Sequence, residues 1–232
     1  MAKKQTNQSS NMKLEIACFN LESALIAQEN GADRVEICAG IEVGGTTPTF
    51  EIVKQAREKL SIDLYVMIRP RGGNFVCTEA EFQQMQADIA ALKQFNVDGF
   101  VFGILKEDQT INYEQNKVLV ELAKPFPCTF HRAFDEVENA FEALEDIITC
   151  GFKTILTSGQ KTNVSEGMHR LEELVSKADN RITIMPGGGL RSTNIKTIQQ
   201  NTKAIFYHSS AITDGSETAN AIEIQTLKSN LQ

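Results

Sequence analysis

Several features that would narrow the function of a protein are absent from this sequence of 232 residues. No apolar run approaches the roughly 20 residues of a membrane span, and the first residues lack the apolar stretch of a secretory signal. We therefore expect a cytoplasmic protein with no membrane partner. The net charge is −7, and there is no block of Lys or Arg that would attract nucleic acid. A homo-oligomer is expected on general grounds, because symmetric assemblies are common among soluble proteins.

Paired cysteine motifs are also missing. The five cysteines are odd in number and scattered, with no C-x-x-C pair, which is typical of reduced thiols in a reducing compartment. Residues 1–11 are polar and precede the first apolar segment. They are predicted to be a disordered tail, and residues 12–232 to form one domain.

What the sequence does contain is a regular alternation of strand and helix patterns. Short runs of β-branched and aromatic residues are each followed by apolar residues at helical spacing. This alternation requires a parallel sheet, either open and doubly wound or closed. Eight units without a dinucleotide-binding fingerprint favour a closed (β/α)8 barrel, the TIM barrel. The strands are predicted to begin near Lys13, Asp33, Ile62, Val97, Phe126, Phe152, Arg181 and Lys203.

Helix starts are predicted from local chemistry. Thr78 with Glu81 and Asn163 with Glu166 have the spacing of a capping box, in which two side chains satisfy free backbone N–H groups reciprocally. Pro48 is predicted at the first position of a helix, where its missing N–H costs nothing.

The alternation of side chains along the strands predicts a charged barrel interior. If Val35 and Ile37 face the helices, then Arg34, Glu36 and Cys38 face the barrel axis. Buried charges cost several kcal/mol each unless paired, so they form either a structural ion-pair cluster or a functional site. Their position near the carboxyl ends of barrel strands favours function. The same alternation turns inward Glu15, Tyr65, Met67, Arg69, Thr129 and His131.

Two segments contain the other candidate catalytic groups. Arg69-Pro70-Arg71-Gly72-Gly73 combines two guanidinium groups with flexible backbone, which suits an anionic ligand, although a tight turn with solvated arginines is an alternative for Arg71. His131-Arg132-Ala133-Phe134-Asp135 places an imidazole beside a cation and a carboxylate. The candidate catalytic residues are Glu15, Glu36, Arg69, His131 and Asp135.

The last three strands end in small residues that could bind an oxyanion through backbone N–H groups and hydroxyls. Barrels commonly hold phosphate at this corner, but glycines also serve sharp turns. The candidate anion-binding residues are Arg71, Arg132, Thr157, Ser158, Gly159, Gly187, Gly188, Gly189, His208, Ser209 and Ser210.

Cys18 and Cys38 lie near the ends of adjacent predicted strands. Two thiolates could hold a soft ion such as Cu(I) there, if the first strand bends so that both point inward. The alternative is that both are small buried apolar residues.

Five ordered blocks carry a resemblance to a known family. They are residues 30–38 (NGADRVEIC), 44–48 (GGTTP), 68–73 (IRPRGG), 129–135 (TFHRAFD) and 156–159 (LTSG). Together they resemble the CutC family between about Lys13 and Ala211. The resemblance implies a TIM barrel, a cytoplasmic location and a role in copper homeostasis, with Cys18 and Cys38 as copper ligands.

Two hypotheses follow. The first is a copper-handling protein that binds Cu(I) through Cys18 and Cys38. The second is an enzyme that acts on a small anionic or phosphorylated substrate, with Glu36 or His131 as acid or base and arginines as clamps. The sequence does not select a reaction class.

Overall fold

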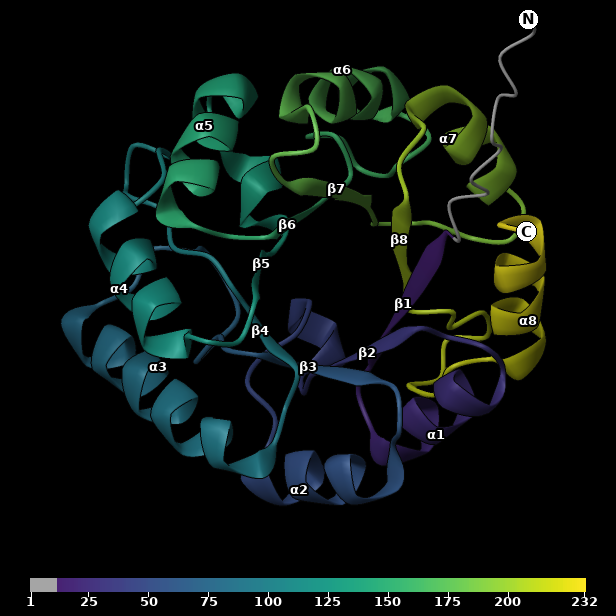
Figure 1. The fold of residues 1–232 in the computed structure, drawn as a ribbon, viewed down its shortest axis with the longest axis horizontal. Helices are drawn as coiled ribbons and strands as arrows, with labels where there is room; N and C mark the ends of the chain where they lie inside the picture. The colour runs from purple at the N-terminus through teal and green to yellow at the C-terminus, as the bar shows by residue number, and fades with distance from the viewer. Residues whose placement is uncertain (1–11) are drawn as a thin grey trace, which may run out of the picture.

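The computed structural model describes residues 12–232, which form a ring of eight strands enclosed by eight α-helices (Figure 1). The predicted tail, residues 1–11, lies outside the described residues. The strands are β1 (Lys13–Cys18), β2 (Arg34–Ile37), β3 (Asp63–Met67), β4 (Gly99–Phe102), β5 (Cys128–Phe130), β6 (Thr154–Thr157), β7 (Thr183–Pro186) and β8 (Phe206–Ser209). The helices are α1 (Leu21–Glu29), α2 (Phe50–Lys59), α3 (Glu79–Leu92), α4 (Tyr113–Ala123), α5 (Ala140–Cys150), α6 (Met168–Ala178), α7 (Ile195–Thr202) and α8 (Ala221–Asn230), with short 3-10 helices η1 (Ile41–Val43), η2 (Lys93–Phe95) and η3 (Arg132–Glu136).

The strands run parallel in the order β7-β6-β5-β4-β3-β2-β1-β8. Strands β7 and β8 lie beside each other and complete the ring, although no ladder joins them within residues 12–232 (Figure 1). The predicted (β/α)8 barrel is therefore confirmed. Because Glu15 pairs in register with Arg34 of β2 and with His208 of β8, three polar side chains from neighbouring strands meet.

The apolar core lies mainly between the strands and the helices. Leu14, Ile16, Val35 and Ile37 are fully buried there, and burial of each side chain stabilises the fold by about 1.5–3 kcal/mol. A smaller cluster, made by Cys38, Tyr65, Met67, Val101 and Phe19, occupies the barrel interior. The predicted alternation in β2 is thus observed, because its apolar and polar residues face opposite sides.

One capping box forms as predicted. The Thr78 side chain accepts the backbone N–H of Glu81, and the Glu81 carboxylate accepts the backbone N–H of Thr78. Asn163 and Glu166 also bond to each other, but α6 begins only at Met168, so this pair stabilises the turn before the helix.

The prediction of a helix starting at Pro48 is wrong, since α2 begins at Phe50 with Thr49 as its N-cap. The segment before the helix is held extended by bonds to the loops that follow β2 and β3. Thr46 forms an isolated β-bridge with Ala39, and the Thr47 N–H donates to the Arg69 carbonyl. Tertiary hydrogen bonds therefore delay the helix by two residues.

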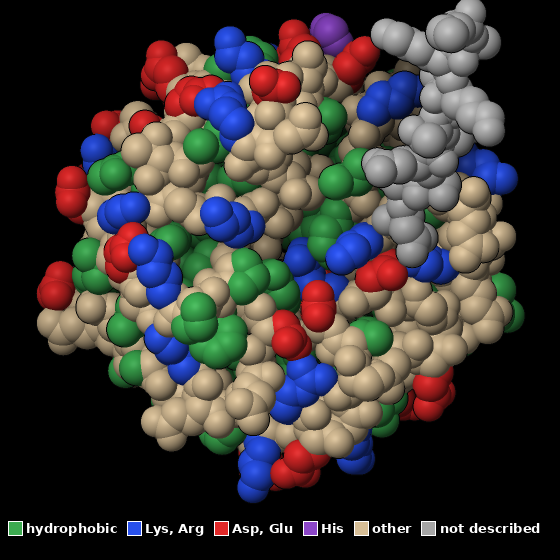
Figure 2. Space-filling model, in the orientation of Figure 1, with side chains coloured by type: hydrophobic (Ala, Val, Ile, Leu, Met, Phe, Trp, Pro, Cys, Tyr) green, Lys and Arg blue, Asp and Glu red, His purple; other side chains and the backbone are tan. Residues whose placement is uncertain are grey.

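No helix within residues 12–232 combines the length and the apolar character that crossing a membrane requires. Figure 2 shows acidic and basic side chains interspersed over one face of the molecule, without a broad area of either sign. This distribution agrees with the lack of a basic block in the sequence.

Candidate functional site

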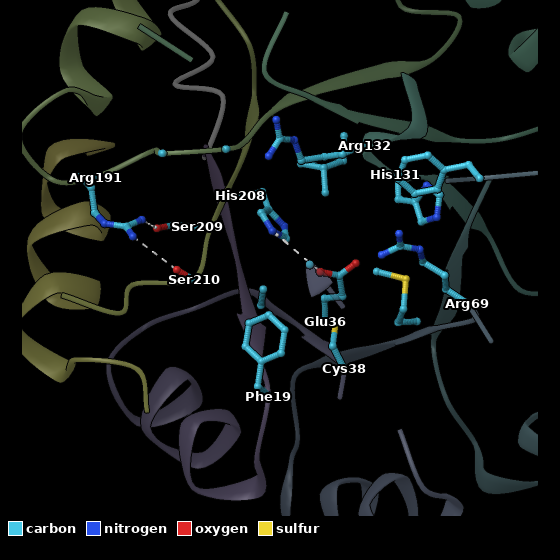
Figure 3. A pocket seen from close by; sticks show the side chains of 17 residues that line it. Phe19, Glu36, Cys38, Arg69, His131, Arg132, Arg191, His208, Ser209 and Ser210 are labelled. Atoms are coloured by element: carbon cyan, nitrogen blue, oxygen red, sulfur yellow. Dashed lines mark hydrogen bonds and ion pairs between the residues drawn. The ribbon is translucent and has the colours of Figure 1, made fainter. Parts of the chain in front are cut away.

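A cavity of about 180 Å³ opens where the carboxyl ends of the strands meet (Figure 3). Residues from β1, β2, β3, β5, β6, β7 and β8, or from the loops that follow them, form its wall. The lining residues are Ala17, Phe19, Glu36, Cys38, Gly44, Met67, Arg69, Phe75, His131, Arg132, Leu156, Gly188, Gly189, Arg191, His208, Ser209 and Ser210.

Beneath the cavity, Glu15 holds two cationic partners. Arg34 Nε donates to one carboxylate oxygen, and His208 Nδ1 donates to the other at 2.7 Å. Burial alone would raise the pKa of Glu15, but the Arg34 charge and the His208 hydrogen bond outweigh it and lower the pKa to about 2. Glu15 is therefore a fixed anion, and it fixes the orientation of the His208 ring.

Arg34 is itself enclosed. Its guanidinium lies 3.9 Å from the centre of the Tyr65 ring and 4.2 Å from that of Phe206. These cation–π contacts, together with the ion pair to Glu15, compensate for the burial of the charge. The Glu15–Arg34 ion pair therefore forms the floor of the cavity, while Glu36, the other carboxylate considered for a structural cluster, makes no ion pair with an arginine among residues 12–232.

Glu36 lies above this floor and faces the cavity (Figure 3). Its Oε2 is 3.8 Å from His208 Nε2, while its Oε1 is buried without a hydrogen-bond partner among residues 12–232. Burial raises the pKa of Glu36 to about 7, because the lowering effect of the His208 charge is smaller. A carboxyl group with a pKa near neutrality can accept and return a proton.

The pKa of His208 is also raised, but for a different reason. Burial alone would lower its pKa, but the hydrogen bond that His208 donates to Glu15 and the charge of Glu36 raise it overall. Glu15 and Glu36 therefore favour the protonated form of the His208 ring.

Arg69 lines the cavity and also connects two loops by hydrogen bonds. Its Nη1 donates to the carbonyls of Val43 and Gly45, and its Nη2 donates to that of Gly73. Its Nε is buried and has no partner within residues 12–232. Arg69 thus combines a structural role with one unused donor beside the cavity.

His131 lines the cavity as a neutral ring. Burial and the nearby Arg69 charge lower its pKa to about 3. Since its Nδ1 accepts the backbone N–H of Ala133, the proton of the neutral ring is on Nε2. His131 is therefore built to donate a hydrogen bond from Nε2 rather than to exchange protons near neutral pH.

Asp135 points toward the end of β6 instead of the cavity. It accepts the hydroxyl of Thr157 and the backbone N–H groups of Ser158 and Gln160, and it also binds Arg132 Nε at 2.8 Å. Of the groups that the sequence suggested for anion binding, the Thr157 hydroxyl and the Ser158 N–H are thus engaged by Asp135, and the Gly159 N–H donates to Thr157 Oγ1. Asp135 therefore secures the β6 loop and positions Arg132.

The ends of β7 and β8 form the remaining wall. Arg191 connects them, because its Nη1 donates to the Leu190 carbonyl and Ser209 Oγ, and its Nη2 donates to Ser210 Oγ (Figure 3). Gly188 lies on the same wall, with a positive φ of 96° that favours glycine.

The two cysteines with proposed metal roles face different surroundings. Cys38 lines the cavity, whereas Cys18 belongs to the core cluster of Leu14 and Ile16, and its thiol donates to the Ile16 carbonyl. Burial raises the pKa of both thiols, and the Glu36 carboxylate raises each further. The strand bend that would turn both thiols inward is not observed.

Glu15, Glu36 and His208 bring possible metal-binding atoms within 4.8 Å of one another. The donors are two carboxylate oxygens and one imidazole nitrogen, a set that does not fit the soft ion Cu(I). Glu15 is also already paired with Arg34 and His208. The soft donors in the cavity wall are Cys38 and Met67, and a Cβ at Gly45 would lie 3.6 Å from the Cys38 sulfur and 3.4 Å from the Met67 methyl carbon.

The cavity thus gathers most of the candidate residues, while their roles stay predictions. Glu15 lies below the cavity and bonds to His208 of the cavity wall. Arg71 lies outside the cavity, where it binds Glu81 and the carbonyls of its own loop. Sequence reasoning missed Arg191, Phe19 and Phe75. Arg191 lies two positions after Gly189, the last residue of the glycine segment, and this nearness could have suggested it. The other candidates outside the cavity wall are Cys18, Asp135, Thr157, Ser158, Gly159 and Gly187.

The fold and this site together define a (β/α)8 barrel protein with a polar cavity at the carboxyl ends of its strands. Within that class, the chain belongs to the CutC family, whose model matches residues 12–213. This range includes every residue that lines the cavity.

Individual relatives agree with the family assignment. The chain is 41% identical over 198 residues to the copper homeostasis protein cutC homolog of Homo sapiens, covering 85% of this chain and 72% of that protein. It is 47% identical over 199 residues to a CutC family protein of Parabacteroides distasonis, covering 85% and 82%. The crystal structure of CutC from Streptococcus agalactiae superposes with a TM-score of 0.83 at 33% identity, covering 87% of this chain and all of that one.

Proposed function

We propose that this chain takes part in copper homeostasis. The main support is that the chain is 41% identical over 198 residues to a human protein named for that role. The five cysteines are all free, which supports a reducing compartment such as the cytoplasm as the place where it acts. A homo-oligomer stays a prediction.

Direct binding of Cu(I) is the finer part of this proposal. Cys38 is the thiol in the cavity wall, so Cys38→Ser is expected to weaken Cu(I) affinity about tenfold or more, equivalent to about 1.4 kcal/mol. Titration against a competing Cu(I) chelator measures it, with Cys18→Ser and the double variant alongside. Cys128→Ser is the matched control, because Cys128 is equally buried but packs in the outer core. Equal affinity in the double variant and the control would refute copper binding at these thiols.

We infer a second function for the cavity, acid–base catalysis on a small anionic substrate. The supporting observation is that Glu36, with an unpartnered buried oxygen, faces the same cavity as Arg69, Arg132 and Arg191. The arginines would bind and orient the anion, Glu36 would accept and return a proton, and neutral His131 would donate a hydrogen bond to an oxygen that gains charge.

A thermal-shift screen with phosphate, sulfate, acetate and citrate tests anion binding. An anion that binds the native state raises the melting temperature, and Arg69→Ala should remove that rise. Arg57→Ala is the matched control, since Arg57 also bonds to backbone carbonyls, those of Leu60 and Ile62, but lies outside the cavity. The inference fails if no anion in the panel shifts the melting temperature of the unmodified protein.

A further inference from the structure

The corner of the cavity between β7 and β8 has unused hydrogen-bond donors. The backbone N–H groups of Gly188, Gly189 and Ser210 donate to no acceptor among residues 12–232. All three residues line the cavity. Unpaired backbone donors next to a cavity are typical of sites that bind an anion.

The peptide orientation directs one of these donors away from a neighbouring loop. The Gly188 carbonyl accepts the backbone N–H of Val164 at 2.9 Å, and Val164 does not line the cavity. In a trans peptide the N–H points opposite to the carbonyl, so the Gly189 N–H points away from Val164. The Gly189 carbonyl is likewise engaged, by Asn194 Nδ2 at 2.9 Å.

Positive charge lies next to these donors. A Cβ added at Gly188 would be 3.0 Å from Arg132 Cζ and 3.1 Å from Arg132 Nη1. Arg132 Nε binds Asp135 and its Nη2 binds Ser158, while Nη1 has no partner among residues 12–232. Arg191, tied to Ser209 and Ser210, adds a second cation at the same corner.

We propose that this corner binds the phosphate group of a small phosphomonoester, which is the substrate class of the acid–base function proposed above and rests on it. A phosphate has three free oxygens and can accept from three backbone N–H groups and a guanidinium at once, whereas a carboxylate has two oxygens. The β6 loop takes no part, because Asp135 already binds its N–H groups.

This placement orients the remainder of the substrate. With the phosphate between Gly188 and Ser210, the rest of the molecule extends toward Glu36 and His131 in the same cavity. The volume of about 180 Å³ restricts that remainder to a few heavy atoms.

Calorimetric titration with inorganic phosphate and with acetate tests the proposal. Phosphate should bind the unmodified protein more tightly than acetate does, and Arg132→Met should weaken phosphate binding about tenfold or more. Gly188→Ala should weaken it similarly by filling the space beside Arg132. Arg181→Met is the matched control, since Arg181 also pairs with a carboxylate, Glu145, but lies outside the cavity.

The possible outcomes separate the two proposals. Phosphate binding that is absent, or equal in all four proteins, overturns the phosphate site. If acetate binds as tightly as phosphate does, the phosphate site is also overturned. If that acetate binding is lost in Arg69→Ala, the proposed function with an anionic substrate stays in place. If neither anion binds, both proposals fall. Circular dichroism confirms that each variant is folded, and the two corner variants test the site independently.

Discussion

At the scale of single residues, the environment of His131 determines its chemistry. Its ring is buried, lies 4.9 Å from the Phe75 ring centre and is close enough to Arg69 for that charge to disfavour protonation. The sequence placed this histidine beside Arg132 and Asp135 and suggested acid–base exchange. The structure instead makes it a neutral donor, because burial and the Arg69 charge disfavour protonation, while Asp135 bonds to the end of β6 instead.

The neutrality of His131 predicts a particular pH dependence. Its pKa is about 3 in the folded protein and about 6.5 in an unfolded chain. As pH falls from about 6.5 toward 3, the unfolded chain takes up a proton that the folded protein does not, so stability decreases. We expect the His131 ring signals in NMR to stay constant between about pH 5 and 8, assigned by their loss in His131→Asn. A midpoint near the ordinary pKa of about 6.5 would contradict the neutral-donor role.

At the scale of elements, Asp135 links η3 to the end of β6. Removing the charge in Asp135→Asn leaves Thr157 and two backbone N–H groups with a weaker acceptor, so we expect a loss of about 2–3 kcal/mol in the free energy of unfolding. Urea denaturation measures this loss, and hydrogen exchange at Ser158 and Gln160 should accelerate.

The control is Asp146→Asn on α5, since Asp146 is exposed and its side chain accepts no hydrogen bond within residues 12–232. It should change stability by less than about 0.5 kcal/mol. Equal stability in the two variants would show that Asp135 does not hold the β6 loop.

Element boundaries show where local chemistry suffices. The capping box at Thr78 was predictable because its atoms all lie within one turn of chain. The start of α2 was not, because Thr46 and Thr47 bond to residues in the loops after β2 and β3. Local spacing thus predicted the helix start at Thr78, whereas the start of α2 depended on bonds to other loops, and Asn163 with Glu166 formed a turn before α6 instead of its cap.

At the scale of the whole molecule, the barrel brings together what the chain separates. Glu15 and His208 are 193 positions apart yet their side chains bond, because β8 returns to β1 and completes the ring. The family model matches residues 12–213, and this range contains every residue of the cavity wall. Both proposed functions depend on that closure.

By itself, the sequence determined the strand and helix alternation, the closed barrel, the inward face of β2 and the family. These follow from short-range periodicity and ordered motifs, which involve residues near one another in the chain. Only the tertiary structure decided the protonation of Glu36 and His131, the separation of Cys18 from the cavity and the inclusion of Arg191. Those properties depend on burial and on charges contributed by distant strands, and no local pattern encodes either.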